Sequence, residues 1–263
     1  MENGNWSLVF FTLLAQASAG TVILGTAYRL SGGGKLWTRE KDRVISGASL
    51  LLLVTGLAFS FFHLGYPAHS VNAIRNLATS WMSREIICTM ALIGSLLLWV
   101  IESVRKRTKT TLPIGNILSF VLSVALVYIM IRVYRIPAMT LSGSGAVNVS
   151  FISTTLFLGT AILWFTTMIR KSEVNRGLLY LGSIFLLSSF INLIITVSSN
   201  YASVVLQKPV IILYLLAIFP SITLFFEKHK NKWTTCGVII MTLGIIAEIF
   251  NRYMILNISI TGL

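Results

Sequence analysis

The segment HLGYPAHSVNAIRNLATSWMSREI, residues 63–86, separates two strongly apolar stretches of the chain. It begins with His63, which closes the first stretch, and ends beside Glu85, which opens the second. Ionisable side chains at the edge of a membrane span are costly, so they mark candidate functional sites. His and Glu are also the side chains best suited to accept protons near neutral pH. The segment therefore divides two membrane-length pieces and supplies the leading functional candidates.

The composition indicates an integral membrane protein. Of the 263 residues, 55% are hydrophobic and only 11% are charged, and the mean hydropathy is +0.83. A soluble domain carries roughly 25% charged residues, so this chain holds more apolar surface than it can bury inside itself. The apolar runs are long and uninterrupted, which favours helices over the alternating strands of a membrane barrel. The expected fold class is all-α, with membrane-spanning helices.

Eight spans are expected, each close to the ~17–25 residues that cross a bilayer. They cover residues 6–28, 44–62, 85–103, 114–133, 149–169, 177–198, 209–226 and 234–255. The two longest connections, 63–84 and 134–148, are too short to be domains. Residues 1–263 are therefore expected to form one polytopic membrane domain. No basic residue precedes the first span and no cleavage pattern follows it, which indicates a retained helix and not a signal peptide.

The basic residues are distributed unevenly over the connections. The first, third, fifth and seventh loops carry 15 of the 21 Lys and Arg residues. The other loops and spans hold the remaining six, which are Arg75, Arg84, Arg132, Arg135, Lys208 and Arg252. The positive-inside rule then places the odd loops in the cytoplasm and both termini, with the 63–85 loop, on the outer side. The net charge of +13 forms no contiguous basic face for a nucleic acid.

Several cofactor classes are not expected. A haem held by two histidines needs an imidazole pair inside the membrane, and the three histidines are His63, His69 and His229, outside the spans. His63, His69 and Glu85 lack a recognisable metal-ligand spacing. Cys88 and Cys236 lie near opposite ends of their spans, so they are expected to stay unpaired, and an iron–sulfur cluster needs about four ligands. No metal site is predicted.

The surroundings of His63 and Glu85 suggest one shared site. Gly65 and Pro67 turn the chain, Tyr66 and Trp81 are typical interfacial aromatics, and Ser80 or Ser83 can cap the next helix. Both side chains are then expected at one lateral cavity near the outer surface. A structural alternative stays open, because an interfacial His at a helix end and a Glu in a first helical turn both suit the helix dipole.

A second group of polar residues is expected at the same level. Glu248 and Arg252 are four apart on the last span and can pair. The fourth span ends in Arg132, Tyr134 and Arg135, and Gln16 lies near the middle of the first span. An ion pair that only fixes helix packing is the alternative interpretation for Glu248 and Arg252.

These residues carry a family resemblance. HLGYP at 63–67, Asn72 and SWMSREI at 80–86 resemble the signature of the DMSO reductase anchor subunit family. WSLVFFTLLAQASAG at 6–20 resembles its opening helix, and RVY at 132–134 and the Glu248–Arg252 pair resemble further family positions. The chain departs from the family in being short and in having a Ser/Gly-rich 134–148 loop with Pro137.

The resemblance implies a haem-free, eight-helix anchor that oxidises menaquinol in anaerobic respiration, in the bacterial cytoplasmic membrane. Such a subunit holds an iron–sulfur electron-transfer subunit and a molybdopterin catalytic subunit against the outer face, and these partners carry the Fe–S clusters and the molybdenum. The family's quinol-site residues fall on His63 and Glu85. The other candidates for binding the quinol are Gln16, Tyr66, Arg84, Arg132, Glu248 and Arg252.

Two other functions remain open from the sequence. Eight helices with few buried charges would also suit a secondary transporter or a proton-coupled channel, although transporter sites usually lie at the membrane midplane between broken helices. A structural tether without a quinol site is the third interpretation. Copurification of the soluble subunits separates an anchor from a transporter, and quinol-dependent reduction of the clusters separates an anchor from a tether.

The 15-to-6 division of Lys and Arg predicts the topology directly. Reporter fusions at Lys35, Lys106, Lys171 and Lys230 should all report a cytoplasmic location, because basic loops are retained on that side. A single external reporter among the four would contradict the eight-span arrangement.

Overall fold

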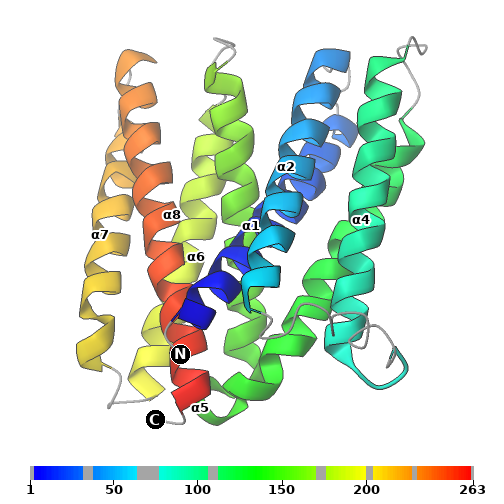
Figure 1. The fold of residues 1–263 in the computed structure, drawn as a ribbon. Helices are drawn as coiled ribbons and strands as arrows, with labels where there is room; N and C mark the ends of the chain where they lie inside the picture. Colours follow the sequence, from blue (N-terminus) through cyan, green and yellow to red (C-terminus); the bar gives the residue numbers. More distant parts are fainter. Residues whose placement is uncertain are drawn as a thin grey trace. The chain divides into compact units, whose positions relative to one another are not determined.

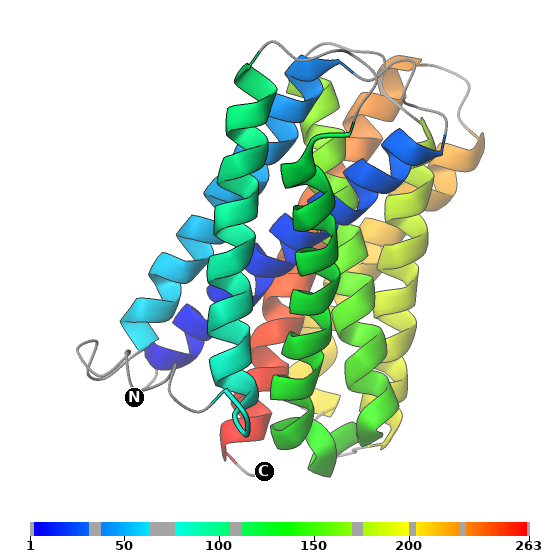
Figure 2. The ribbon, with the colours of Figure 1, turned by 90° about the vertical axis from the view of Figure 1, so that its right-hand side faces the viewer.

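The computed structural model describes seven α-helices, drawn in Figure 1 and, after a quarter turn, in Figure 2. The described residues are 3–31, 38–63, 77–105, 112–169, 176–199, 204–226 and 230–261, and they contain no strand. The helices are α1 (Asn3–Leu30), α2 (Arg39–His63), α4 (Trp81–Val104), α5 (Ile114–Ile169), α6 (Arg176–Ser199), α7 (Val204–Phe226) and α8 (Lys230–Thr261). The prediction of an all-helical fold is confirmed.

In the described parts of the chain, seven helical segments are long and apolar enough to cross a membrane, which makes the chain a multi-pass membrane protein. They are Trp6–Leu30, Arg39–Phe61, Trp81–Val104, Ile114–Tyr134, Val147–Met168, Gly177–Ile195 and Trp233–Leu256. The remaining expected span, 209–226, lies in α7, where the described apolar segment Lys208–Ile222 is shorter. The eighth crossing therefore stays a prediction.

Helix α5 corrects one expectation. The connection at 134–148 was expected as a loop, yet helical turns continue through it, and α5 runs for 56 residues. Such a helix would measure about 84 Å if straight, far more than the ~30 Å apolar core of a bilayer, so it contains two spans. Ser and Gly lower helix stability by at most about 1 kcal/mol each. Backbone groups near lipid need hydrogen-bond partners, and a continued helix supplies them.

The chain forms two compact units, Met1–Val133 and Tyr134–Leu263. The first, unit 1, contains α1, α2, α4 and the first part of α5, and the second, unit 2, contains the rest of α5 with α6, α7 and α8. The boundary falls inside α5, close to where its first apolar segment ends at Tyr134. One domain over residues 1–263 stays a prediction.

Small and hydroxyl-bearing residues bring the helices of unit 1 together. α1 packs against α2, and α2 against α4. The hydroxyl of Ser18 donates to the carbonyl of Ser49 at 2.8 Å, joining α1 to α2. Ser95 and Ser119 share a hydrogen bond of 2.9 Å between α4 and α5, which lie side by side in Figures 1 and 2. Within lipid, such close approaches and hydroxyl bonds replace the hydrophobic effect as the force between helices.

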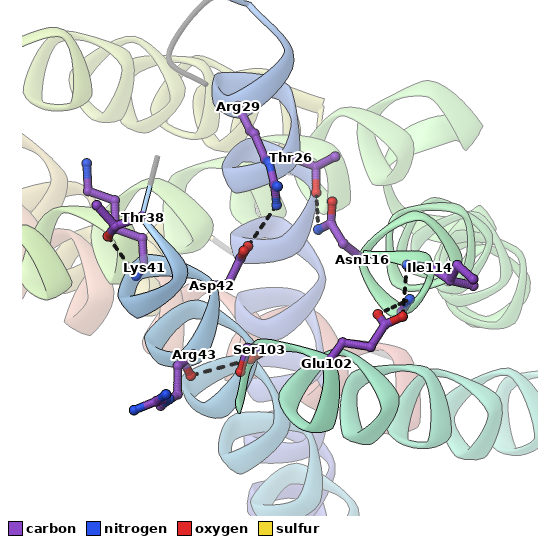
Figure 3. A network of polar contacts seen from close by, with 12 residues as sticks. Thr26, Arg29, Thr38, Lys41, Asp42, Arg43, Glu102, Ser103, Ile114 and Asn116 are labelled. Carbon is purple, nitrogen blue, oxygen red and sulfur yellow. Dashed lines mark hydrogen bonds and ion pairs between the residues drawn. The ribbon is translucent and has the colours of Figure 1, made fainter. Parts of the chain in front are cut away.

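A network of polar contacts links the helices at one end of unit 1, as Figure 3 shows. Arg29 of α1 forms a salt bridge of 2.9 Å with Asp42 of α2. Asn116 of α5 donates to the hydroxyl of Thr26 of α1 at 2.9 Å. The carboxylate of Glu102, near the end of α4, accepts the backbone N–H groups of Ile114 at 3.3 Å and Gly115 at 2.9 Å. Glu102 thereby caps α5, because the first N–H groups of a helix lack partners within it.

Glycines of α6 and α8 create the tight packing of unit 2. A Cβ atom at Gly244 or Gly237 of α8 would collide with the rings of Phe157 and Trp164 of α5, respectively. A Cβ atom at Gly182 of α6 would lie 2.7 Å from the terminal methyl carbon of Met241 of α8. α6 and α7 both pack against α8. Aromatic rings of α5 therefore fill notches that glycine leaves in α8.

Gly115 provides a test of this packing in unit 1. A Cβ atom there would lie 2.6 Å from the Cα atom of Trp99 on α4, and backbone atoms yield less readily than a side chain. Gly115→Ala should lower the free energy of unfolding by about 1–3 kcal/mol, the usual cost of overpacking. The measurement is reversible unfolding in mixed detergent micelles.

Gly94→Ala on α4 is the matched control, because no atom lies within 4 Å of a Cβ atom at Gly94. It should leave stability unchanged or raise it by at most about 1 kcal/mol, since Ala favours helix over Gly. Equal losses in the two variants would contradict the packing described for α4 and α5.

Candidate functional site

The start of α4 positions the first candidate residue. Ser80 is the N-cap, with an extended backbone, and its side chain accepts the N–H of Ser83 at 3.3 Å. The expectation that a serine caps this helix is confirmed, and the capping residue is Ser80. The helix begins at Trp81, four residues before the expected span start at 85. Glu85 therefore lies beyond the first turn, which corrects the expectation that it sits within it.

This position weakens the interpretation of Glu85 as a partner of the helix dipole, since that effect fades within the first turn. Glu85 lies on the buried side of α4, in line with Cys88, Thr89 and Leu92. The residue is 5% exposed. Among the described residues, no group hydrogen-bonds its buried Oε1 atom. Leaving a buried carboxyl oxygen without a hydrogen bond lowers the free energy of unfolding by about 1–3 kcal/mol or more. The Oε1 atom of Glu85 can therefore bind a proton or accept a hydrogen bond from a ligand.

Two of the predicted binding residues meet at Trp81. The guanidinium carbon of Arg84 lies 4.3 Å from the centre of the Trp81 ring, and that of Arg132 lies 4.9 Å from it. Tyr128 approaches the same ring edge-on, with centroids 6.1 Å apart. Arg84 also donates to the carbonyls of Leu77 at 2.9 Å and Ala78 at 2.7 Å. In the sequence Trp81 is only an interfacial aromatic, but its spacing of three from Arg84 could have indicated the contact.

The remaining candidates near Glu85 are placed only in part. Gln16 is fully buried in α1, in the core of unit 1. His63 is the last residue of α2, but its side chain lies outside the described residues, as do Tyr66 and His69. The predicted meeting of His63 and Glu85 therefore stays a prediction.

A second buried group lies in unit 2. Glu248 and Arg252 of α8 are each 1% exposed. The hydroxyl of Thr154 donates to Oε2 of Glu248 at 2.7 Å, and the guanidinium carbon of Arg252 lies 3.9 Å from the centre of the Phe151 ring. Phe151 in turn stacks on Tyr134, with centroids 5.4 Å apart. Both charged residues thus hold α8 against α5, in agreement with the packing interpretation.

Tyr214 of α7 extends this group. It is fully buried, lies next to Glu248, and its hydroxyl accepts a hydrogen bond of 3.4 Å from the amide of Asn251. Thr154, Phe151, Tyr214 and Asn251 are absent from the sequence predictions. Of these four, only Asn251 could have been suggested by the sequence, because it lies between Glu248 and Arg252 on one helix.

The cysteines and the acidic residues form no metal site in the described part of the chain. Cys88 and Cys236 are both free, as predicted, and the thiol of Cys88 donates to the carbonyl of Leu122 at 3.6 Å. Within the described ranges, no three His, Cys, Asp or Glu residues lie close enough to hold a metal ion. A carboxyl group such as that of Glu85 can exchange a proton and form hydrogen bonds.

Relatives among characterised proteins agree with the resemblance seen in the sequence. The protein is 29% identical to the anaerobic dimethyl sulfoxide reductase chain YnfH of Escherichia coli over 168 residues, which is 60% of this protein and 57% of the relative. It is 26% identical over 183 residues to a component of the anaerobic dimethyl sulfoxide reductase of Haemophilus influenzae, covering 68% and 63%. A component of the sulfite dehydrogenase of Allochromatium vinosum is 36% identical over 85 residues, covering 31% and 26%.

The matched region thus spans about three fifths of the first two relatives. No solved structure matches the protein. The family model described as DMSO reductase anchor subunit (DmsC) matches residues 1–211, which is most of the sequence. This multi-pass helical protein therefore belongs to the DMSO reductase anchor subunit family.

Proposed function

We propose that the protein is the membrane anchor of a molybdoenzyme complex of the DMSO reductase type, and that it binds and oxidises menaquinol near the outer membrane face. Family membership over residues 1–211 supports the anchor role. The observation that carries the quinol site is the buried carboxyl group of Glu85, whose Oε1 atom has no hydrogen-bond partner among the described residues. The relatives are named as components of reductases and of a sulfite dehydrogenase, in keeping with this assignment.

Oxidation of a quinol releases two protons and two electrons. A proton acceptor must lie within hydrogen-bond reach of each ring hydroxyl. Glu85 is the first acceptor in this proposal, and a low-polarity environment suits a carboxylate that must bind and release a proton. His63, at the end of α2, is the second. The electrons pass to the iron–sulfur subunit docked over the same side, because electron storage belongs to the redox partners and not to side chains.

The proposed arrangement has eight crossings, both termini outside, and residence in the bacterial cytoplasmic membrane. The iron–sulfur subunit and the molybdopterin subunit then lie on the outer side, forming a heterotrimer with this protein. The division of basic residues between alternate loops supports this orientation.

Glu85→Gln or His63→Ala should abolish quinol-driven turnover, because each variant removes one of the two proton acceptors. The expected loss in rate is at least ~10²-fold. Turnover with an artificial electron donor that acts directly on the soluble subunits should survive. The measurement compares both donors in the assembled, membrane-bound complex.

Glu102→Gln is the matched control, since Glu102 is the other acid of α4 and Gln keeps one oxygen that can accept the N–H of Gly115. It should retain quinol turnover. If assembled Glu85→Gln complexes oxidise quinol at a near-normal rate, the quinol site lies elsewhere. Loss of both activities together would make the 63–86 segment a docking element.

The purified complex should contain no haem in this subunit. The three histidines of the sequence offer no pair within the spans, and bis-histidine haem requires one. A reduced-minus-oxidised spectrum should lack b-type bands assigned to this protein, and such bands would overturn the expectation.

A further inference from the structure

We infer that Arg84, Trp81 and Arg132 form a binding site for the phosphate of an anionic phospholipid in the outer leaflet. The site is built from unit 1 alone, and it does not depend on quinol oxidation. The juxtaposition behind it is two guanidinium groups over one indole ring, at 4.3 and 4.9 Å from its centre.

The charge at this site is unbalanced. Neither Arg84 nor Arg132 forms a salt bridge with a carboxylate in the part of the chain that the structure describes. Glu85 follows Arg84 in sequence, but it points into the core of unit 1. The start of α4 adds the partial positive charge of a helix N-terminus. An oxyanion is the ligand that this combination fits, because guanidinium groups bind phosphate through charged hydrogen bonds.

The location of these two cations is exceptional. Six of the 21 basic residues fall outside the odd loops, and Arg84 and Arg132 are two of them. Residues 48 positions apart in the sequence meet on one ring, although the outer side of the protein is otherwise poor in basic residues. A cluster of cations there attracts the anionic headgroups of lipids.

An apolar stripe continues from Arg132 along α5. Tyr128, Val124, Val121 and Ile117 follow one another at helical spacing, and each residue is between 47% and 57% exposed. They lie within the membrane-length segment Ile114–Tyr134. From Tyr128 to Ile117 the helix rises about 16 Å, which is close to half of the ~30 Å apolar core of a bilayer.

This stripe favours a lipid over the other source of acidic groups, a soluble partner subunit. The acyl tail of a lipid can cover the stripe for the depth of one leaflet while its phosphate binds the two guanidinium groups. A soluble protein would contact the cations but could not extend into the span. Tyr and Trp side chains at such a level are typical of the lipid headgroup region.

The test uses the full-length protein, purified in a zwitterionic detergent. Binding of fluorescent phosphatidylglycerol and of phosphatidylcholine with the same acyl tails is measured by titration. The wild-type protein should prefer phosphatidylglycerol, and Arg132→Gln should weaken its binding about fivefold, as expected for one lost cation. Binding of phosphatidylcholine should not change. Arg132→Lys should keep most of the preference, because it keeps the charge.

Arg105→Gln is the matched control, as Arg105 is an exposed cation at the other end of α4. It should leave phosphatidylglycerol binding within about twofold of the wild type, since surface charges far from a site are screened. Millimolar inorganic phosphate should not displace the lipid, and displacement would overturn the lipid assignment. If Arg132→Gln fails to fold, the salt dependence of the wild type decides: equal affinity at low and high salt overturns the proposal.

A last outcome separates the two sources of negative charge. If Arg132→Gln binds phosphatidylglycerol normally but loses copurification of the soluble subunits, the cations dock an acidic protein surface and the proposal is wrong. Near-normal quinol turnover in Glu85→Gln would refute the proposed quinol site but leave the lipid titration unaffected, so the two proposals fail independently.

Discussion

In the apolar core of a bilayer no water satisfies a polar group, so each donor and acceptor must find its partner within the protein. Many hydroxyl groups of this protein do so locally, by donating to a carbonyl three or four residues earlier. Thr21 bonds to Ala17, Thr89 to Glu85 and Thr155 to Phe151 in this way. Longer contacts, such as the Glu102 cap on α5, close the helix ends. Several buried polar atoms of the described residues have no such partner, among them one carboxyl oxygen each of Glu85 and Glu248.

Glu85 and Glu248 are both buried within spans, and Glu248 has contacts that fix its carboxyl group. Glu248 accepts a hydrogen bond from Thr154 and lies on the same helix as Arg252. A carboxylate with such neighbours is typical of a packing contact, whose value lies in fixing one arrangement of helices. Glu85 lies on the core side of α4. Glu85 and Glu248 each keep one buried carboxyl oxygen without a hydrogen-bond partner in the described structure. The hydrogen bond from Thr154 supports a structural role for Glu248, while the chemical role of Glu85 belongs to the proposed function.

The sequence predicted the helical membrane fold well because long apolar runs have few alternatives. It misplaced the start of α4 by four residues, since Trp81, Met82 and Ser83 precede the apolar run but still follow the Ser80 cap. It also treated 134–148 as a loop because Ser and Gly are abundant there. Composition does not indicate whether a segment must keep its helical backbone hydrogen bonds. Helix α5 continues through residues 134–148.

The sequence predicted Glu85, Arg84, Arg132, Glu248 and Arg252 as candidate site residues, but not the residues that they contact. Charged residues stand out in an apolar sequence, whereas their partners Trp81, Phe151 and Thr154 are common residues of a membrane helix. Thr154 and Glu248 are 94 positions apart, and no periodicity links two such positions. Only packing reveals that Trp81 joins Arg84 to Arg132.

The same separations have a consequence for how the protein is made. Asn116 reaches back 90 residues to Thr26, and Glu248 reaches back 94 residues to Thr154. A ribosome adds about 5–20 residues per second, so each earlier residue waits roughly 5–20 s for its partner. During that interval Thr26 and Thr154 already lie in helices that have been synthesised, while their partners have not. Each four-helix unit therefore stays open until its last helix arrives, and the final polar contact closes it.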